Sequence, residues 1–131
     1  MSFKSPLGKA IGLGSAKHGF SHWWLQRVSA VALIPLSLWF VCSLVSLTQA
    51  DYSTVEAFFD SPLQASLMII FVLVLIYHAQ TGLQVVIEDY IHQKIPNLVL
   101  LYGVKFLSVL LAVMAVVSVF RIGAQPNNYT Q

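Results

Sequence analysis

The sequence predicts an all-α integral membrane protein, a bundle of three transmembrane helices. Hydrophobic residues make up 57% of its 131 residues and charged residues only 9%, whereas an ordinary soluble domain is about 25% charged. The mean hydropathy is +0.76, and the chain contains three long apolar stretches. This composition excludes a soluble enzyme with a solvated surface. It also excludes a disordered chain, which requires low hydrophobicity and high charge.

The three apolar stretches cover about residues 28–47, 62–87 and 98–122. Each is long enough to cross a bilayer, because a transmembrane helix needs about 20 residues to span a hydrocarbon core of about 30 Å. Pro35 in the first stretch is compatible with a membrane helix. A long polar segment precedes the first stretch, and the stretch itself is longer than the apolar region of a signal peptide. We therefore expect a helix that is retained in the mature protein. The three spans are expected to form a single membrane-anchor domain, residues 1–131.

The charges predict how the helices are oriented. Residues 1–27 contain four basic residues and no acidic one, whereas residues 49–63 contain three acidic residues and no basic one. The positive-inside rule therefore places the N-terminus and the loop 88–97 inside, and the loop 49–63 and the C-terminus outside. A mitochondrial targeting segment is the less favoured interpretation of the basic N-terminus. The short N-terminus favours a bacterial inner membrane over a mitochondrial one.

Two further classes of site are excluded by the residue types. No part of the chain can build the solvated basic face that binds nucleic acid, so membrane lipid is the expected environment. Cys42 is the only cysteine, so the chain has neither a disulfide framework nor a cysteine-based metal site.

His78 is the most informative polar residue within the spans, where polar groups are costly and mark candidate functional sites. It precedes Glu88 by about 15 Å of helix. On a helix, His78, Gly82, Val85 and Asp89 fall on one line, and Gly82 leaves space for a flat ligand one turn from the imidazole. This arrangement suits haem ligation, with the second axial ligand supplied by a partner chain. A buried histidine hydrogen-bonded to a neighbouring helix is the equally compatible alternative.

Asp89 and Tyr90 end the second span at its inner boundary. Reduction of a quinone requires a hydrogen-bond donor aimed at a carbonyl oxygen and a route for protons. Tyr90 could be that donor, with Asp89 holding its orientation. An aromatic-belt tyrosine beside a solvated acid is the alternative.

The remaining polar residues near the spans have less specific interpretations. Arg27 could pair with a haem propionate or with Asp89, or it could be the last basic residue before the first span. Lys105 is expected to snorkel to the inner interface. Gln80 and Gln84 are expected to form hydrogen bonds between helices, and His22 lies at the interface without a defined role.

Residues 78–90, HAQTGLQVVIEDY, resemble the small hydrophobic membrane anchor of succinate dehydrogenase (respiratory complex II), the D-type anchor. The shared pattern is a histidine, a glycine four residues later, and Asp-Tyr eleven and twelve residues later. Residues 26–30, QRVSA, form a shorter and weaker match. The sister cytochrome b anchor typically continues from its glycine with Arg-His-Leu. Here Gly82 is followed by Leu-Gln-Val, which indicates the D-type anchor.

The resemblance implies a membrane subunit that is not catalytic by itself. In this family two anchor chains hold a b-type haem, and an iron–sulfur subunit and a flavoprotein subunit dock on the inner face. Electrons from succinate reach ubiquinone at the membrane boundary, which links the tricarboxylic acid cycle to the respiratory chain. By resemblance, His78 is an axial ligand of the haem iron, Tyr90 donates a hydrogen bond to ubiquinone beside Asp89, and Arg27 lies near the propionates. The anchor of a quinol:fumarate reductase and a cofactor-free assembly or scaffold protein are the competing functions.

Overall fold

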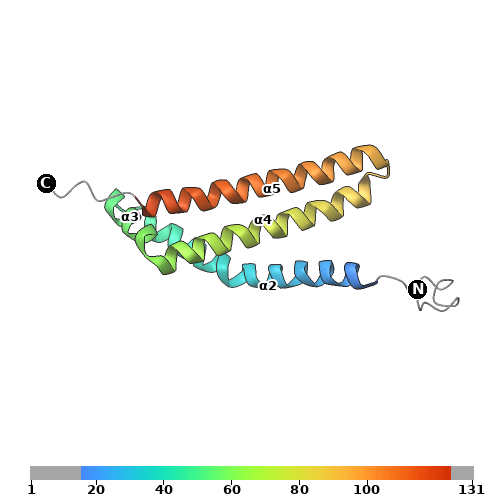
Figure 1. Cartoon of the computed structure of the whole chain (residues 1–131). Coiled ribbons are helices and arrows are strands. Elements are labelled where there is room, and N and C mark those ends of the chain that lie inside the picture. Colours follow the sequence, from blue (N-terminus) through green and yellow to red (C-terminus); the bar gives the residue numbers. More distant parts are fainter. Residues whose placement is uncertain (1–15, 125–131) are drawn as a thin grey trace, which may run out of the picture.

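A computed structural model describes residues 16–124 of the chain (Figure 1). Within these residues the secondary structure is entirely helical: α2 (Ala16–Leu47), α3 (Tyr52–Asp60), α4 (Pro62–Tyr90) and α5 (Lys94–Gly123). The helices α2, α4 and α5 are long and apolar enough to cross a membrane. The predicted fold class, an all-α bundle with three membrane-spanning helices, is therefore confirmed. Lys4, Lys9 and the predicted outer C-terminal tail from residue 125 lie outside the described residues.

Each predicted span lies within a longer helix. Helix α2 begins before residue 28, α4 continues past residue 87 to Tyr90, and α5 begins before residue 98 at Lys94. The difference arises because hydropathy marks where the hydrocarbon ends, whereas helical hydrogen bonds continue into the interface. The predicted inner loop 88–97 is consequently reduced to residues 91–93, and Asp89 and Tyr90 belong to the last turn of α4.

The acidic segment 49–63, expected to be a loop, contains the short helix α3. Val55, Phe58 and Phe59 lie at helical spacing and are partly buried, and α3 packs against both α4 and α5. The ring of Phe58 also stacks on Trp39 of α2, with ring centroids 6.4 Å apart. This apolar face makes α3 a helix despite its acidic residues. Pro62 then begins α4. Proline suits this position because the backbone N–H that it lacks would have no hydrogen-bond partner within the first turn of a helix.

Helix α4 is the central helix, since it packs against α2 on one side and α5 on the other (Figure 1). Near α3, the rings of Phe40 and Phe71 stack at 4.6 Å, and Trp39 Nε1 donates a hydrogen bond to Gln64 Oε1 at 3.2 Å. From there α2 and α4 diverge toward the N-terminus of α2, whereas α4 and α5 remain side by side (Figure 1). The diverging ends of α2 and α4 frame the candidate site.

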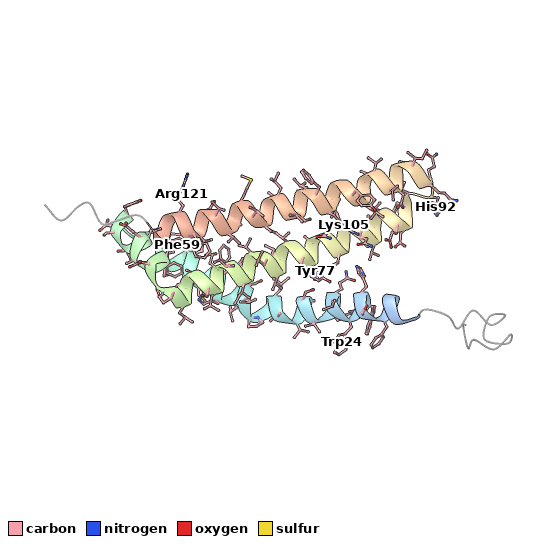
Figure 2. All side chains as sticks on the ribbon, in the orientation of Figure 1. Trp24, Phe59, Tyr77, His92, Lys105 and Arg121 are labelled. Carbon is pink, nitrogen blue, oxygen red and sulfur yellow. The ribbon has the colours of Figure 1, made fainter. Side chains whose placement is uncertain are left out.

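The acidic segment 49–63 and the start of α2 lie at opposite ends of the bundle (Figure 1), as the sequence predicts. The start of α2 lies at the same end as the α4–α5 turn, and α3 lies at the opposite end (Figure 1). Asp51, Glu56 and Asp60 are therefore at the α3 end, where Arg121 of α5 also lies (Figure 2), whereas Lys94 is at the turn with Glu88 and Asp89. The positive-inside rule predicts that the turn faces the cytoplasm.

Candidate functional site

His78 is held against α2 by a buried serine. The imidazole is partly buried and lies about 18 Å along α4 from its C-terminal end. Its Nδ1 is 3.0 Å from Ser29 Oγ. Ser29 is only 7% exposed, and its hydroxyl donates a hydrogen bond to the backbone oxygen of Gln26 at 2.8 Å. This is the side-chain hydrogen bond that joins α2 and α4 nearest to their diverging ends.

Ser29 is the residue that the sequence interpretation missed. No hydroxyl of the first span was singled out from the sequence, because a serine can satisfy its hydroxyl within its own helix, as Ser29 also does. Its second contact depends on which face of α2 meets α4. The available signal was that Ser29 and Phe40 are eleven residues apart, about three helical turns, and so share one face.

The hydrogen bond to Ser29 occupies one nitrogen of the imidazole and leaves the other free. Within the described part of the chain, Nε2 of His78 has no hydrogen-bond partner. The interhelical bond is the one expected for a buried structural histidine, but it does not compete with ligation. A metal ligand needs one nitrogen lone pair, and metal-bound histidines usually donate their other N–H to a neighbouring group.

The surface of α4 beside His78 is open at Gly82. A Cβ placed at Gly82 would meet nothing within 4 Å. Because α4 is continuous through Tyr90, Val85 and Asp89 continue the same line toward the turn, and both side chains are exposed. The line therefore runs from the imidazole over an apolar, open stretch to a carboxylate at the end of the helix.

Thr81 secures the backbone of the same turn. It is the most deeply buried polar residue described, at 2% exposure, and its hydroxyl lies 3.0 Å from the backbone oxygens of both Tyr77 and His78. A hydroxyl that bonds back to its own helix keeps its polar group satisfied in an apolar environment.

The two glutamines of α4 behave differently from each other. Gln84 Nε2 donates to Glu88 Oε1 at 2.8 Å on the same helix, so the expected bond between helices is wrong for this residue. The carboxylate one turn further on is within reach, as is usual for residues four apart. Gln80 lines an otherwise apolar groove between α4 and α5, together with Ser108. Among the described residues, no hydrogen bond to the Gln80 amide is found.

Asp89 and Tyr90 are presented at the surface rather than to each other. Both are exposed, Tyr90 at 81%, and no hydrogen bond joins their side chains in the described structure. The turn that follows them is held by Asn97 of α5, whose Nδ2 donates to the backbone oxygen of Ile91 at 2.8 Å and more weakly to that of Ile87 at 3.4 Å. Asn97 therefore fixes the end of α4 that carries the two residues.

Arg27 faces away from α4. Its guanidinium lies over the ring of Trp23, 5.5 Å from the centroid, and within residues 16–124 it forms no ion pair with Asp89. The reason is helical geometry: two residues rotate the side chain by about 200° from Ser29, which faces α4. The suggested pairing with Asp89 is therefore not formed in this chain.

Lys105 and the other histidines also have defined positions. Lys105 is exposed on α5 (Figure 2), about 16 Å along the helix from its start at Lys94. His92 lies in the α4–α5 turn (Figure 2), beyond the C-terminal end of α4 that is about 18 Å from His78. His22 is two turns before Ser29 on the same face of α2. In the described region, no group of three or more His, Cys, Asp and Glu side chains is arranged to hold a metal ion.

Comparison with known families identifies the family of the chain. Residues 1–120 match the family described as the succinate dehydrogenase/fumarate reductase transmembrane subunit. The chain belongs to this family. The resemblance inferred from residues 78–90 is thereby confirmed, because the match extends over the greater part of the chain.

Individual members of the transmembrane subunit family support the same relationship. The chain is 38% identical over 122 residues to the succinate dehydrogenase hydrophobic membrane anchor subunit of Rickettsia bellii, covering 92% of this chain and 97% of the relative. It is 31% identical over 106 residues to the protein of the same name from Paracoccus denitrificans, covering 81% and 82%. The succinate dehydrogenase membrane anchor subunit of Reclinomonas americana is 30% identical over 96 residues, covering 71% and 80%. No solved structure matches the chain significantly.

Proposed function

We propose that this chain is the D-type membrane anchor of a succinate dehydrogenase, one domain over residues 1–131 and not catalytic by itself. The observation that carries the proposal is the family match over residues 1–120, supported by relatives named succinate dehydrogenase hydrophobic membrane anchor subunits. The partners are then a cytochrome b anchor subunit, an iron–sulfur subunit and a flavoprotein subunit. The relatives from Rickettsia and Paracoccus favour a bacterial inner membrane.

His78 fits the role of axial ligand to a haem b shared with the sister anchor. Its Nδ1 is engaged by Ser29, its Nε2 is unpartnered among the described residues, and the adjacent surface at Gly82 has room for a flat group. When bound, haem b supplies a one-electron redox centre. This chain would supply one imidazole nitrogen and an apolar wall to hold the group, and a residue of the sister anchor would complete its coordination. By resemblance, Arg27 would lie near a propionate, but its guanidinium faces away from α4 and would have to turn toward the His78 side of α2 to reach one.

Tyr90 and Asp89 fit a site that reduces ubiquinone at the inner membrane boundary. The Tyr90 hydroxyl is exposed and free to donate a hydrogen bond to a quinone carbonyl oxygen. The Asp89 carboxylate lies beside it in sequence, is exposed, and lies on the His78 line of α4. In this role Asp89 would hold or relay a proton to the quinone oxygen, and Asn97 would keep the end of α4 in place.

The decisive experiment is a dithionite-reduced minus oxidised spectrum of the purified complex, wild type beside His78→Ala. We expect a b-type signal in the wild type that is lost or altered in the variant. His92→Ala is the matched control, because it removes a histidine from the turn and should leave the spectrum unchanged. A wild-type complex with neither a haem signal nor quinone reductase activity would exclude the proposal.

The same preparation separates the alternatives. The family description also includes fumarate reductase, whose anchor would support oxidation of a low-potential quinol by fumarate faster than reduction of ubiquinone by succinate. An assembly or scaffold protein without a cofactor predicts that His78→Ala changes neither the spectrum nor electron transfer.

A further inference from the structure

The Ser29 hydroxyl makes two polar contacts with a single hydrogen. Its Oγ is 2.8 Å from the backbone oxygen of Gln26 and 3.0 Å from Nδ1 of His78. Ser29 is buried between α2 and α4, so water cannot freely replace either contact. Where that one hydrogen lies therefore decides which nitrogen of the imidazole carries its proton.

A count of protons and lone pairs selects one arrangement. A backbone oxygen can only accept a hydrogen bond, so the Ser29 hydroxyl must donate to Gln26 for that contact to be attractive. If the hydroxyl donated to His78 instead, two oxygen lone pairs would face each other at 2.8 Å. Both contacts are hydrogen bonds only when Nδ1 carries a proton and donates it to Ser29 Oγ. In the neutral imidazole, the lone pair is then on Nε2.

We propose that Ser29 is a positioning residue that selects Nε2 of His78 as the ligating nitrogen and fixes the plane of the ring. The inference rests on the proposed haem ligation by His78 and adds to it a residue on the neighbouring helix. Acceptors for the second N–H of a ligating histidine hold its tautomer and orientation and make it a stronger electron donor. Hydrogen bonding of this kind is also one of the means by which a protein adjusts a haem potential.

Thr81 complements this role from the backbone side. Its hydroxyl bonds to the backbone oxygens of Tyr77 and His78, so the turn that carries the imidazole is held independently of Ser29. Removing the Ser29 hydroxyl should therefore release the ring without unwinding α4.

The experiment measures the haem spectrum and midpoint potential of the whole purified complex with Ser29→Ala, Ser29→Thr and Ser29→Val. Threonine keeps a hydroxyl, whereas valine has nearly the same shape without one, so this pair separates hydrogen bonding from packing. Ser46→Ala is the matched control. Ser46 is also on α2 and its hydroxyl bonds back to the residue three positions earlier, at 2.7 Å, but it contacts no histidine.

Ser29→Ala and Ser29→Val should shift the oxidised–reduced equilibrium toward the reduced form by about twofold to tenfold. Tenfold corresponds to an increase in midpoint potential of about 59 mV for one electron. The direction follows because an imidazole without its acceptor donates less electron density to ferric iron. Ser29→Thr should restore the wild-type potential, and Ser46→Ala should not change it.

The outcomes distinguish this inference from the proposed function. If His78→Ala abolishes the haem signal while Ser29→Ala and Ser29→Val keep the wild-type spectrum and potential, the role of Ser29 is refuted and ligation by His78 stands. A threonine variant shifted as far as the valine variant refutes it as well, because packing then explains the effect. If His78→Ala retains the wild-type spectrum, both inferences fail.

Discussion

Gly82→Ala tests whether a bound group occupies the open surface beside His78. In the chain itself this change has no steric cost, because the added Cβ would meet nothing within 4 Å. Replacing glycine by alanine within a helix is favourable by about 0.5–1 kcal/mol. The fold of the free chain should therefore be as stable as the wild type or slightly more so. Any loss must come from something other than residues 16–124 that packs against Gly82.

The expected magnitude follows from contact with a rigid, flat group. A methyl group placed in a close-packed contact costs about 1–3 kcal/mol. At about 1.4 kcal/mol per factor of ten, the affinity for haem should fall by about 5- to 150-fold, and haem should be lost during purification. Gly82→Leu, with a larger side chain, should abolish retention. The assay is the ratio of haem to protein in the purified complex, with thermal unfolding measured in parallel.

Gly103→Ala is the matched control, because a Cβ on this glycine of α5 also meets nothing within 4 Å of the chain. We expect wild-type haem content in this variant. The reasoning is refuted if Gly82→Ala and Gly82→Leu both retain the wild-type ratio of haem to protein, since the surface beside the imidazole would then not contact the haem.

Three other changes follow from the same structure. Tyr90→Phe removes only the hydroxyl, so ubiquinone reduction should fall by about 10²- to 10⁴-fold, the usual range for a positioned proton donor, while Tyr102→Phe on α5 should leave turnover unchanged. Asn97→Ala removes the bonds to the last carbonyls of α4 and should destabilise the turn by about 1–3 kcal/mol. Faster amide hydrogen exchange at residues 91–93 would report it, and unchanged exchange would contradict it. Gly123→Ala places a Cβ 2.9 Å from the backbone oxygen of Phe59, so α3 must shift and the unfolding temperature should fall. Gly103→Ala, on the same helix, should not lower the unfolding temperature, because its Cβ meets nothing within 4 Å.

The sequence predicts the membrane helices because hydropathy and helix length are one-dimensional properties. The three spans and the line from His78 to Asp89 follow from a run of apolar residues and a rotation of 100° per residue. The helix ends do not follow, since hydropathy is silent about where helical hydrogen bonds stop. Helix α3 was missed because its acidic residues suggested a loop, while the rings of Phe58 and Phe59 supply an apolar face that only the fold brings into contact.

The candidate site is less predictable because its key contacts join residues far apart in the chain. The Ser29–His78 bond spans 49 positions, and it depends on the face that α2 turns toward α4. Gln84 is a second residue whose hydrogen-bond partner could not be predicted from spacing alone. Its amide was expected to cross to another helix, but Glu88 lies within reach on its own helix. Local spacing indicates which partners are possible, and packing decides which one is used.

At the diverging ends of α2 and α4, polar groups of the candidate site lack partners among residues 16–124. His22 and Ser29 share the face of α2 that is directed toward α4. On α4, the line of residues from His78 to Asp89 runs toward the α4–α5 turn. The facing parts of the two helices therefore carry polar residues near the turn and apolar residues further inside the bundle. Arg27 points outward from this arrangement and has no carboxylate partner among residues 16–124, and Asp89 is likewise unpaired. Charged side chains at a membrane boundary that do not pair with each other can form ion pairs or hydrogen bonds with groups of another molecule. Under the proposed function, an anion for Arg27 and a second ligand for the haem iron would come from a partner subunit, because the described residues pair Arg27 with no carboxylate.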